Sequence, residues 1–266
     1  MTFRKASEDT HQGCRSLLQK AVRRGNRDLV RKVVKHLSDI GDKAWLRQRC
    51  VVITLEECWP LFQSYTYSSD LLDIADHLCL VSSCVKNKNA AGLGALAYAL
   101  SEGDQTVLRY DHRDKPVQII ASAIQRTEDY WNWLLNKCDR VDQTNQVMKL
   151  KELHKKNGWP WDKAFVLAAG YLYLEDTVPP IHSSRTISTG EFPFVVALDR
   201  HTEKGKNAIR EAARKLGLPV NQVSWMSFYC ESAHTDQCQP AQWWEREQEW
   251  RLGKVGLTVS KAHDLW

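Results

Sequence analysis

The second half of the chain places acidic and imidazole side chains at the ends of apolar runs. The run 195–198 is followed directly by Asp199 and His201, so a carboxyl group and an imidazole lie two residues apart at the edge of a buried segment. That arrangement suits general acid–base catalysis, or a carboxylate that orients an imidazole. Glu231 ends a second apolar run in the same way, and burial there would shift its pKa. We predict Asp199, His201 and Glu231 as catalytic residues.

These residues also have structural alternatives. Asp199 or Thr202 can cap the helix that is expected from residue 206, because Asp and Thr side chains accept hydrogen bonds from the first backbone N–H groups of a helix. Glu231 can equally be the solvated end of a helix. Catalysis and capping remain open at this stage.

Two further groups of side chains have the composition of a nucleic-acid contact. Trp243 and Trp244 open a helix in which tryptophans alternate with glutamates, and they could stack on a base extruded from a duplex. Packing in the core is the default alternative for them. A proline-rich loop carries hydroxyl groups and an arginine that could hold phosphate, its alternative being an ordinary solvated loop. The predicted phosphate-binding residues are His182, Ser183, Ser184 and Arg185.

Positive charge is concentrated in the first fifth of the chain, although the formal net charge is only +5. A field of this sign attracts polyanions, and double-stranded DNA is the partner we expect. A solvated helix surface is the alternative. The predicted DNA-contacting residues are Arg23, Arg24, Arg27, Arg31, Lys35, Arg47 and Arg49.

The cysteines and glycines do not predict a metal or a cofactor. None of the eight cysteines forms a C-x-x-C pair, and the spacing of Cys230, His234 and Cys238 is too loose for a zinc knuckle. We expect the cysteines to be reduced and mostly buried. The segment 205–207 has neither the upstream glycine nor the Ser or Thr of a phosphate-binding loop. We expect neither a bound metal nor a cofactor.

The composition is that of an ordinary globular protein, with 43% hydrophobic and 26% charged residues among 266. No apolar run approaches the roughly 20 residues of a membrane span, and the N-terminus lacks the apolar stretch of a signal peptide. We therefore expect a cytoplasmic protein without a membrane partner, in the host cytoplasm if a phage encodes it.

Helical periodicity dominates the pattern of apolar residues. It predicts a mainly α fold, a multi-helix bundle whose C-terminal half is irregular and has room for one short strand at 192–198. Small residues over 90–100 are typical of close helix packing. A break in composition near 155–160 suggests a basic helical scaffold at 10–150 and a mostly helical domain at 158–266, unless both halves share one core.

The segments 16–26 and 45–57 form a basic helical hairpin that resembles the helical C-terminal region of replication-associated recombination ATPases of the clamp-loader type. The resemblance covers about residues 14–60. It implies a DNA-associated helical scaffold, here without the ATPase. Oligomerisation through a clamp-loader-like collar is one function that this resemblance implies.

Two functions from different classes follow. The helical content, the aromatic residues, the basic face and the Asp/His/Glu set resemble in architecture the helical amino acid:DNA transferases of phage base-hypermodification systems. That resemblance implies an enzyme that binds duplex DNA and transfers an amino acid or amine from a small donor to a hypermodified pyrimidine. The alternative is a non-catalytic DNA-binding or oligomerisation module that resembles the collar.

Overall fold

The computed structural model describes residues 8–108, 114–156, 158–175, 177–184, 200–232 and 238–265. The expected mainly α multi-helix fold is confirmed, because every regular element within these ranges is a helix. Strand-like pairing in the same ranges is confined to three isolated bridges, which join Cys58 to Asn87, Cys84 to Ser183 and Lys86 to Cys238. The expected short strand at 192–198 lies outside the described residues.

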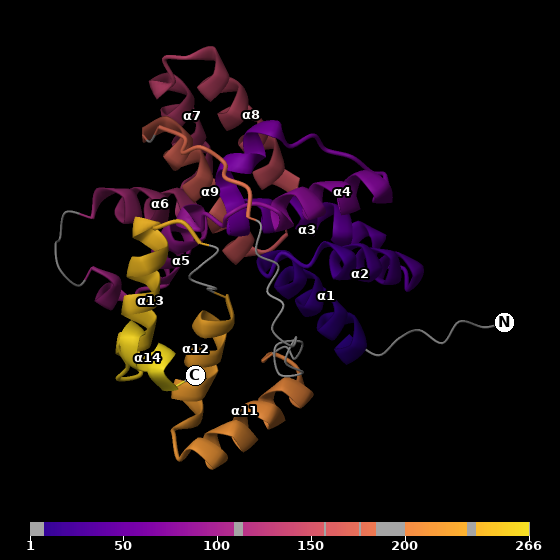
Figure 1. Cartoon of the computed structure of the whole chain (residues 1–266). Helices are drawn as coiled ribbons and strands as arrows, with labels where there is room; N and C mark the ends of the chain where they lie inside the picture. The colour runs from indigo at the N-terminus through magenta and orange to yellow at the C-terminus, as the bar shows by residue number, and fades with distance from the viewer. Residues whose placement is uncertain are drawn as a thin grey trace.

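The helices follow one another through short connections over most of the chain (Figure 1). The first group consists of α1 (Glu8–Arg23), α2 (Arg27–Asp39), α3 (Lys43–Cys58), the 3-10 helix η1 (Trp59–Ser64), α4 (Leu71–Ser82), α5 (Asn89–Ser101) and the 3-10 helix η2 (Gln105–Val107). The second group consists of α6 (Lys115–Gln125), α7 (Thr127–Lys137), α8 (Val141–Lys156), α9 (Pro160–Glu175), α11 (Glu203–Leu216), α12 (Val220–Ser232), α13 (Gln242–Lys254) and α14 (Val259–Leu265).

Local capping explains several of these boundaries. The side chain of Asn26 accepts a hydrogen bond from the backbone N–H of Leu29 at 3.0 Å, as its position before α2 predicts. Thr202 caps α11 in the same way through the N–H of Gly205. Asp42 precedes α3 as expected, but its carboxylate caps nothing and instead accepts two hydrogen bonds from Arg15 of α1. The N-cap of α4 is Asp70, whose side chain accepts hydrogen bonds from the backbone N–H groups of Leu72 and Asp73.

Helix α5 lies at the centre of the molecule, where it packs against α6, α9 and α13. Its small residues permit this, as expected from the sequence. A Cβ atom on Gly92 would lie 2.2 Å from the backbone carbon of Trp243 in α13, and one on Gly94 would lie 2.9 Å from the backbone of Ala164 in α9. The backbones of three helices therefore approach one another as closely as glycine allows.

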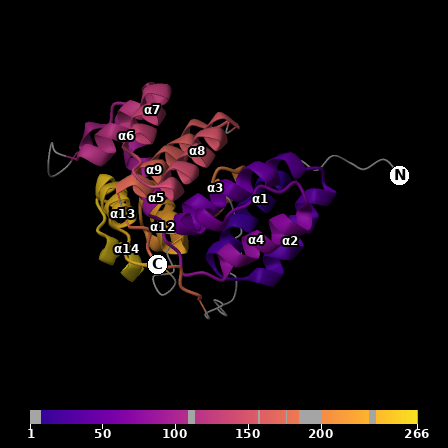
Figure 2. The same cartoon turned by 90° about the horizontal axis from the view of Figure 1, so that it is seen from above.

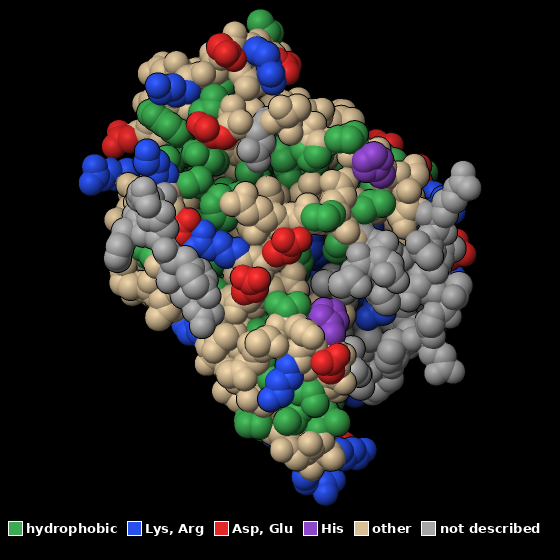
Figure 3. Space-filling view, turned by 60° about the vertical axis from the view of Figure 1, so that its left-hand side comes forward, with side chains coloured by type: hydrophobic (Ala, Val, Ile, Leu, Met, Phe, Trp, Pro, Cys, Tyr) green, Lys and Arg blue, Asp and Glu red, His purple; other side chains and the backbone are tan. Residues whose placement is uncertain are grey.

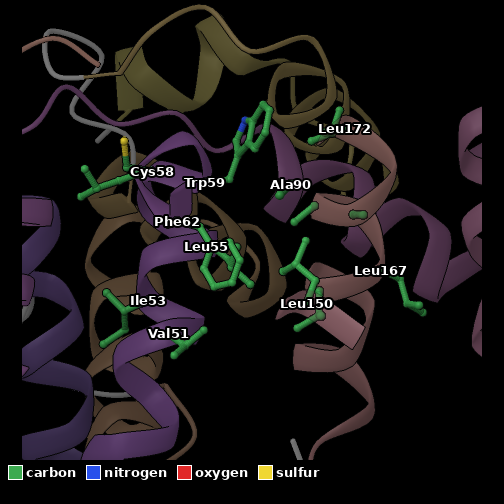
Figure 4. Close-up of a cluster of buried hydrophobic side chains, with 14 of the residues drawn as sticks. Val51, Ile53, Leu55, Cys58, Trp59, Phe62, Ala90, Leu150, Leu167 and Leu172 are labelled. Carbon is green, nitrogen blue, oxygen red and sulfur yellow. The ribbon is translucent and has the colours of Figure 1, made fainter. Parts of the chain in front are cut away.

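One hydrophobic core connects both halves of the chain. Val51 and Leu55 of α3 lie on the side of that helix towards Leu150 of α8, and Ile53 of α3 and Leu167 of α9 belong to the same buried cluster (Figure 4). Trp243 and Trp250 of α13 belong to the same buried cluster, which begins at Leu18 of α1. Viewed from above, α5 and α9 lie between the α1–α4 group and α13 (Figure 2). The break in composition near residue 157 therefore does not coincide with a break in the core.

Replacing Gly92 with alanine should destabilise the protein by at least about 3 kcal/mol, or prevent folding. The added methyl group meets main-chain atoms, which cannot move aside as a flexible side chain can. Gly13 of α1 is the matched control, because a Cβ atom added there would meet nothing within 4 Å, and Gly13→Ala should gain up to about 1 kcal/mol in helix propensity. Thermal unfolding of both variants measures this. Equal melting temperatures for the two variants would contradict the close approach of α5 and α13.

Candidate functional site

The structure describes the three residues predicted as catalytic only in part. Asp199 lies outside the described residues. Glu231 belongs to α12, but its side chain lies outside the described part of the structure. His201 is exposed and immediately precedes the cap of α11. The structure therefore neither assembles nor separates this set, and it assigns the capping role to Thr202.

Two of the predicted DNA-contacting arginines belong to an internal ion network instead. Arg23 donates to Glu57 at 2.5 Å and to Glu56 at 2.9 Å. Arg49 contacts Glu56 at 3.3 Å and Asp162 of α9 at 2.8 Å. These guanidinium groups tie α1, α3 and α9 together, and their charge is already balanced by carboxylates. Arg23 and Arg49 therefore contribute to the stability of the fold, and DNA contact by either residue stays a prediction.

The remaining predicted DNA contacts differ in exposure. Arg24 is buried and Arg47 is half-buried, whereas Arg27 is exposed. Arg31 pairs with Asp76 of α4 at 2.5 Å, and Lys35 pairs with Asp39 at 2.7 Å. Only the exposed members, on α2, can meet a polyanion without rearrangement of the core.

The glutamate at the centre of the network is fully buried. One carboxylate oxygen of Glu57 accepts a hydrogen bond from Arg23. The ammonium group of Lys88, which is 1% exposed, lies 3.0 Å from the other oxygen. Burial by itself would raise the pKa of Glu57, but the charges of Arg23 and Lys88 outweigh it and hold that pKa below its ordinary value. The Lys88 ammonium also lies 4.5 Å from the centre of the Trp244 ring, a cation–π contact.

The predicted base-stacking tryptophans are buried. Trp243 and Trp244 are 7% and 6% exposed, and the backbone N–H of Trp243 donates to Asn89 at the start of α5. The ring of Trp244 lies between Lys88 and Tyr229. Both tryptophans pack in the core, which is the structural alternative given for them above. A base could not stack on them in this conformation.

The predicted phosphate-binding loop pairs with the connection between α4 and α5. The carbonyl of His182 accepts a hydrogen bond from the N–H of Val85 at 2.8 Å, and the N–H of Ser184 donates to Ser83 at 2.7 Å. The side chains of His182 and Ser183 are exposed, and Ser184 is half-buried. Arg185 lies outside the described residues, so phosphate binding by this loop stays a prediction.

A half-exposed group of aromatic and arginine side chains, which we term the aromatic–arginine cluster, lies where α9, α12 and α13 meet. Arg251 of α13 lies over three tryptophan rings, at 4.0 Å from the centre of Trp250, 5.0 Å from Trp225 and 5.9 Å from Trp161. Arg200 lies 4.4 Å from Trp225 and 4.6 Å from Phe228. The cluster thus consists of Trp161, Arg200, Trp225, Phe228, Trp250 and Arg251.

Two properties of this cluster resemble those of a binding surface. Trp161, Trp225, Phe228, Arg200 and Arg251 are all half-buried, so parts of the rings and guanidinium groups remain accessible. The Nε atom of Arg251 is buried without a hydrogen-bond partner among the described residues. A buried donor without a partner is costly, so this position of Arg251 lowers the stability of the fold.

A buried carboxyl group lies directly behind this cluster. Glu247 of α13 is 3% exposed and accepts a hydrogen bond from the hydroxyl of Tyr229 at 2.8 Å. Burial raises the pKa of Glu247 to about 7, against a partial lowering by Tyr229, Arg251 and Lys88. Tyr229 stacks on Trp225, with ring centres 5.9 Å apart. A carboxyl group that is half ionised near neutral pH can donate or accept a proton, as a general acid–base catalyst must.

The sequence analysis selected Trp243 and Trp244 of α13 and did not select Glu247 of the same helix. Glu247 is four residues after Trp243 and three before Trp250, so all three share one helix face. A helix face lined by tryptophans packs into the core, so a glutamate on that face is buried. This spacing of Glu247 between Trp243 and Trp250 is the sequence pattern that could have identified it. No sequence pattern places Arg251 against Trp161 and Trp225, because these residues come from three helices.

The described residues contain neither a cluster of His, Cys, Asp or Glu side chains that could hold a metal ion nor a helix able to cross a bilayer. His234 lies outside the described part. All eight cysteines carry free thiols. The architecture defines an all-α protein with a buried acid beneath an aromatic–arginine cluster. No protein-family model, curated protein or solved structure matches the chain.

Proposed function

We propose that this protein binds DNA and acts chemically on a base, with Glu247 as the group that transfers a proton. The observation that carries the proposal is the pairing of Glu247 with Tyr229 directly behind the aromatic–arginine cluster. An aromatic platform with arginines suits a nucleotide, since the rings stack on a base and the guanidinium groups attract its phosphate.

The proposed division of labour follows from burial. Trp225 and Phe228 are half-buried, and the guanidinium group of Arg200 lies over both rings, so a base stacks on them by displacing that group. Glu247 is buried one layer deeper, so the base edge must reach past Tyr229 to approach it. A base extruded from the duplex has the size and flatness for this approach.

The reaction class we propose is the transfer of an amino acid or amine to a hypermodified pyrimidine. As the amine nitrogen bonds to a carbon atom of the hypermodified pyrimidine, the bond from that carbon to a leaving group carried by the base breaks, and the leaving group departs with the electron pair. The nitrogen loses a proton in the same reaction, and a carboxylate with a pKa near 7 accepts that proton efficiently at neutral pH. Tyr229 fixes the orientation of the carboxylate through its hydroxyl hydrogen bond. Analysis by mass spectrometry of nucleosides from cells that express this chain with its genomic neighbours tests the reaction directly.

Replacing Trp225 with alanine should weaken binding to single-stranded DNA by about 5- to 150-fold, the equivalent of roughly 1–3 kcal/mol for one stacked base. Fluorescence anisotropy of a labelled oligonucleotide measures the affinity. Tyr67→Ala is the control, because Tyr67 is 57% exposed and lies outside the aromatic–arginine cluster. If the two variants lose affinity equally, the cluster is not the stacking surface.

The second candidate is a non-catalytic DNA-binding or oligomerisation module. The internal pairing of Arg23 and Arg49 supports it, because the hairpin then serves as a rigid scaffold. An unmodified nucleoside profile, together with unaltered DNA binding in a Glu247→Gln variant, would favour this candidate over the enzyme.

A further inference from the structure

We infer that α11 is the helix that contacts the phosphate backbone of duplex DNA, in place of the hairpin formed by α1 to α3. The inference rests on the proposed function only in taking DNA as the partner. It concerns the surface that binds the backbone and not the chemistry at Glu247.

The first argument is the charge of the helix. Within its 14 residues, α11 carries five Lys and Arg residues against two glutamates, a formal charge of +3, and all seven side chains are exposed. Lys206, Arg210 and Arg214 follow one another at intervals of four residues, about 6 Å along the axis, so they lie along one side of the helix. The ion pairs of Glu203 with Lys206 and of Glu211 with Lys215 are exposed, and such pairs are weak enough for phosphate to compete. The five cations are Lys204, Lys206, Arg210, Arg214 and Lys215.

The second argument is the contrast with α2. This helix carries four cations, Arg27, Arg31, Lys32 and Lys35, against Asp28 and Asp39, and Asp76 of the packed helix α4 pairs with Arg31. The formal charge of that group is therefore +1. Asp70 and Asp73 of the same α4 region are also exposed. The acidic neighbour cancels much of the positive field that the sequence of the hairpin predicts.

The third argument is continuity with the aromatic–arginine cluster. Among the described helices α11 packs principally against α12, which supplies Trp225 and Phe228. Arg200, which lies over both rings, is three residues before the first residue of α11. A DNA strand that binds along the cations of α11 would therefore run towards the aromatic–arginine cluster. Figure 3 shows Lys and Arg side chains at the lower end of the molecule, the end at which Figure 1 places α11.

The test compares two triple variants of the full-length protein. One replaces Lys206, Arg210 and Arg214 of α11 with glutamine, and the control replaces Arg27, Lys32 and Lys35 of α2 with glutamine, so both lose the same charge. Affinity for a fluorescein-labelled DNA duplex of random sequence is measured by anisotropy between about 50 and 200 mM salt. We expect the slope of log affinity against log salt to fall by roughly one unit per lost contact in the α11 variant, and to change little in the control.

A third variant separates charge from folding. It exchanges Lys206 for arginine and Arg210 and Arg214 for lysine, which keeps every charge, and it should bind with the wild-type salt slope. Equal losses in both glutamine variants, a larger loss in the α2 control, or wild-type protein that does not bind the duplex would each overturn the inference. If the α11 slope falls while Glu247→Gln leaves nucleoside modification intact, α11 keeps its role and only the proposed chemistry fails.

Discussion

Replacing Glu247 with glutamine is expected to lower the yield of modified nucleoside by about 10²–10⁴-fold, the usual contribution of a general acid–base group. Glutamine has nearly the same size and can still accept the hydrogen bond from the Tyr229 hydroxyl, but it cannot take up a proton. The mass spectrum of nucleosides from cells that express the variant with the genomic neighbours of the chain measures the effect. Glu249→Gln is the matched control, since Glu249 is an exposed glutamate of the same helix.

The same variant should change how stability depends on pH. Because burial raises the pKa of Glu247 from 4.5 to about 7, the folded protein binds this proton more tightly than the unfolded chain does. The resulting stabilisation is complete below about pH 4.5 and is lost as the pH rises through 7. A shift of this size corresponds to on the order of 3 kcal/mol. The free energy of unfolding of the wild type should therefore fall by about that amount relative to Glu247→Gln across this range.

The wild type must be compared with Glu247→Gln because two histidines change the free energy of unfolding in the opposite direction as the pH rises. Burial lowers the pKa of His77 and of His154 to about 4, so their contribution to stability is lost as the pH falls below 6.5. Both proteins share these histidines, and their effect cancels in the difference. A difference that is constant from pH 4.5 to 7 would show that Glu247 ionises normally in the folded protein.

Replacing Glu57 with glutamine should destabilise the protein by about 3–5 kcal/mol, because Arg23 and Lys88 would remain buried beside a neutral amide. Because the pKa of Glu57 is lowered in the folded protein, the stabilisation that its carboxylate provides depends on pH. This stabilisation is present above about pH 4.5, the ordinary pKa, and is lost as the pH falls through the lower pKa of the folded state. Chemical denaturation of wild type and variant at neutral pH measures the loss.

Asp39→Asn is the control for this second experiment. Asp39 pairs with Lys35 on the surface of α2, where both side chains are more than half exposed, so its removal should change stability by less than about 1 kcal/mol. If Glu57→Gln proves as mild as Asp39→Asn, the network around Glu57 does not hold α1, α3 and α5 together.

The positions of the helices could be predicted because they depend on local chemistry. Asn26 starts α2 and Gly217, with φ of +65°, ends α11, each for a reason contained within one turn of chain. The small residues of α5 likewise predicted close packing, which Gly92 and Gly94 confirm. At the start of α3 a tertiary contact outweighs the local signal: Asp42 occupies the N-cap position, but its carboxylate accepts hydrogen bonds from Arg15 instead of from the helix.

The roles of the charged residues could not be predicted, because a charge acts through its spatial neighbours. The amino-acid sequence by itself determined a helical chain with a positive first fifth and a tryptophan-rich α13. Only the tertiary structure decided that Arg23 and Arg49 meet carboxylates from α3 and α9, that Glu247 lies beneath the aromatic–arginine cluster, and that α4 brings Asp76 to Arg31 of α2. Coulomb energies and desolvation depend on distance and burial. These are set by contacts between residues far apart in the sequence, such as Arg49 and Asp162, which are 113 positions apart.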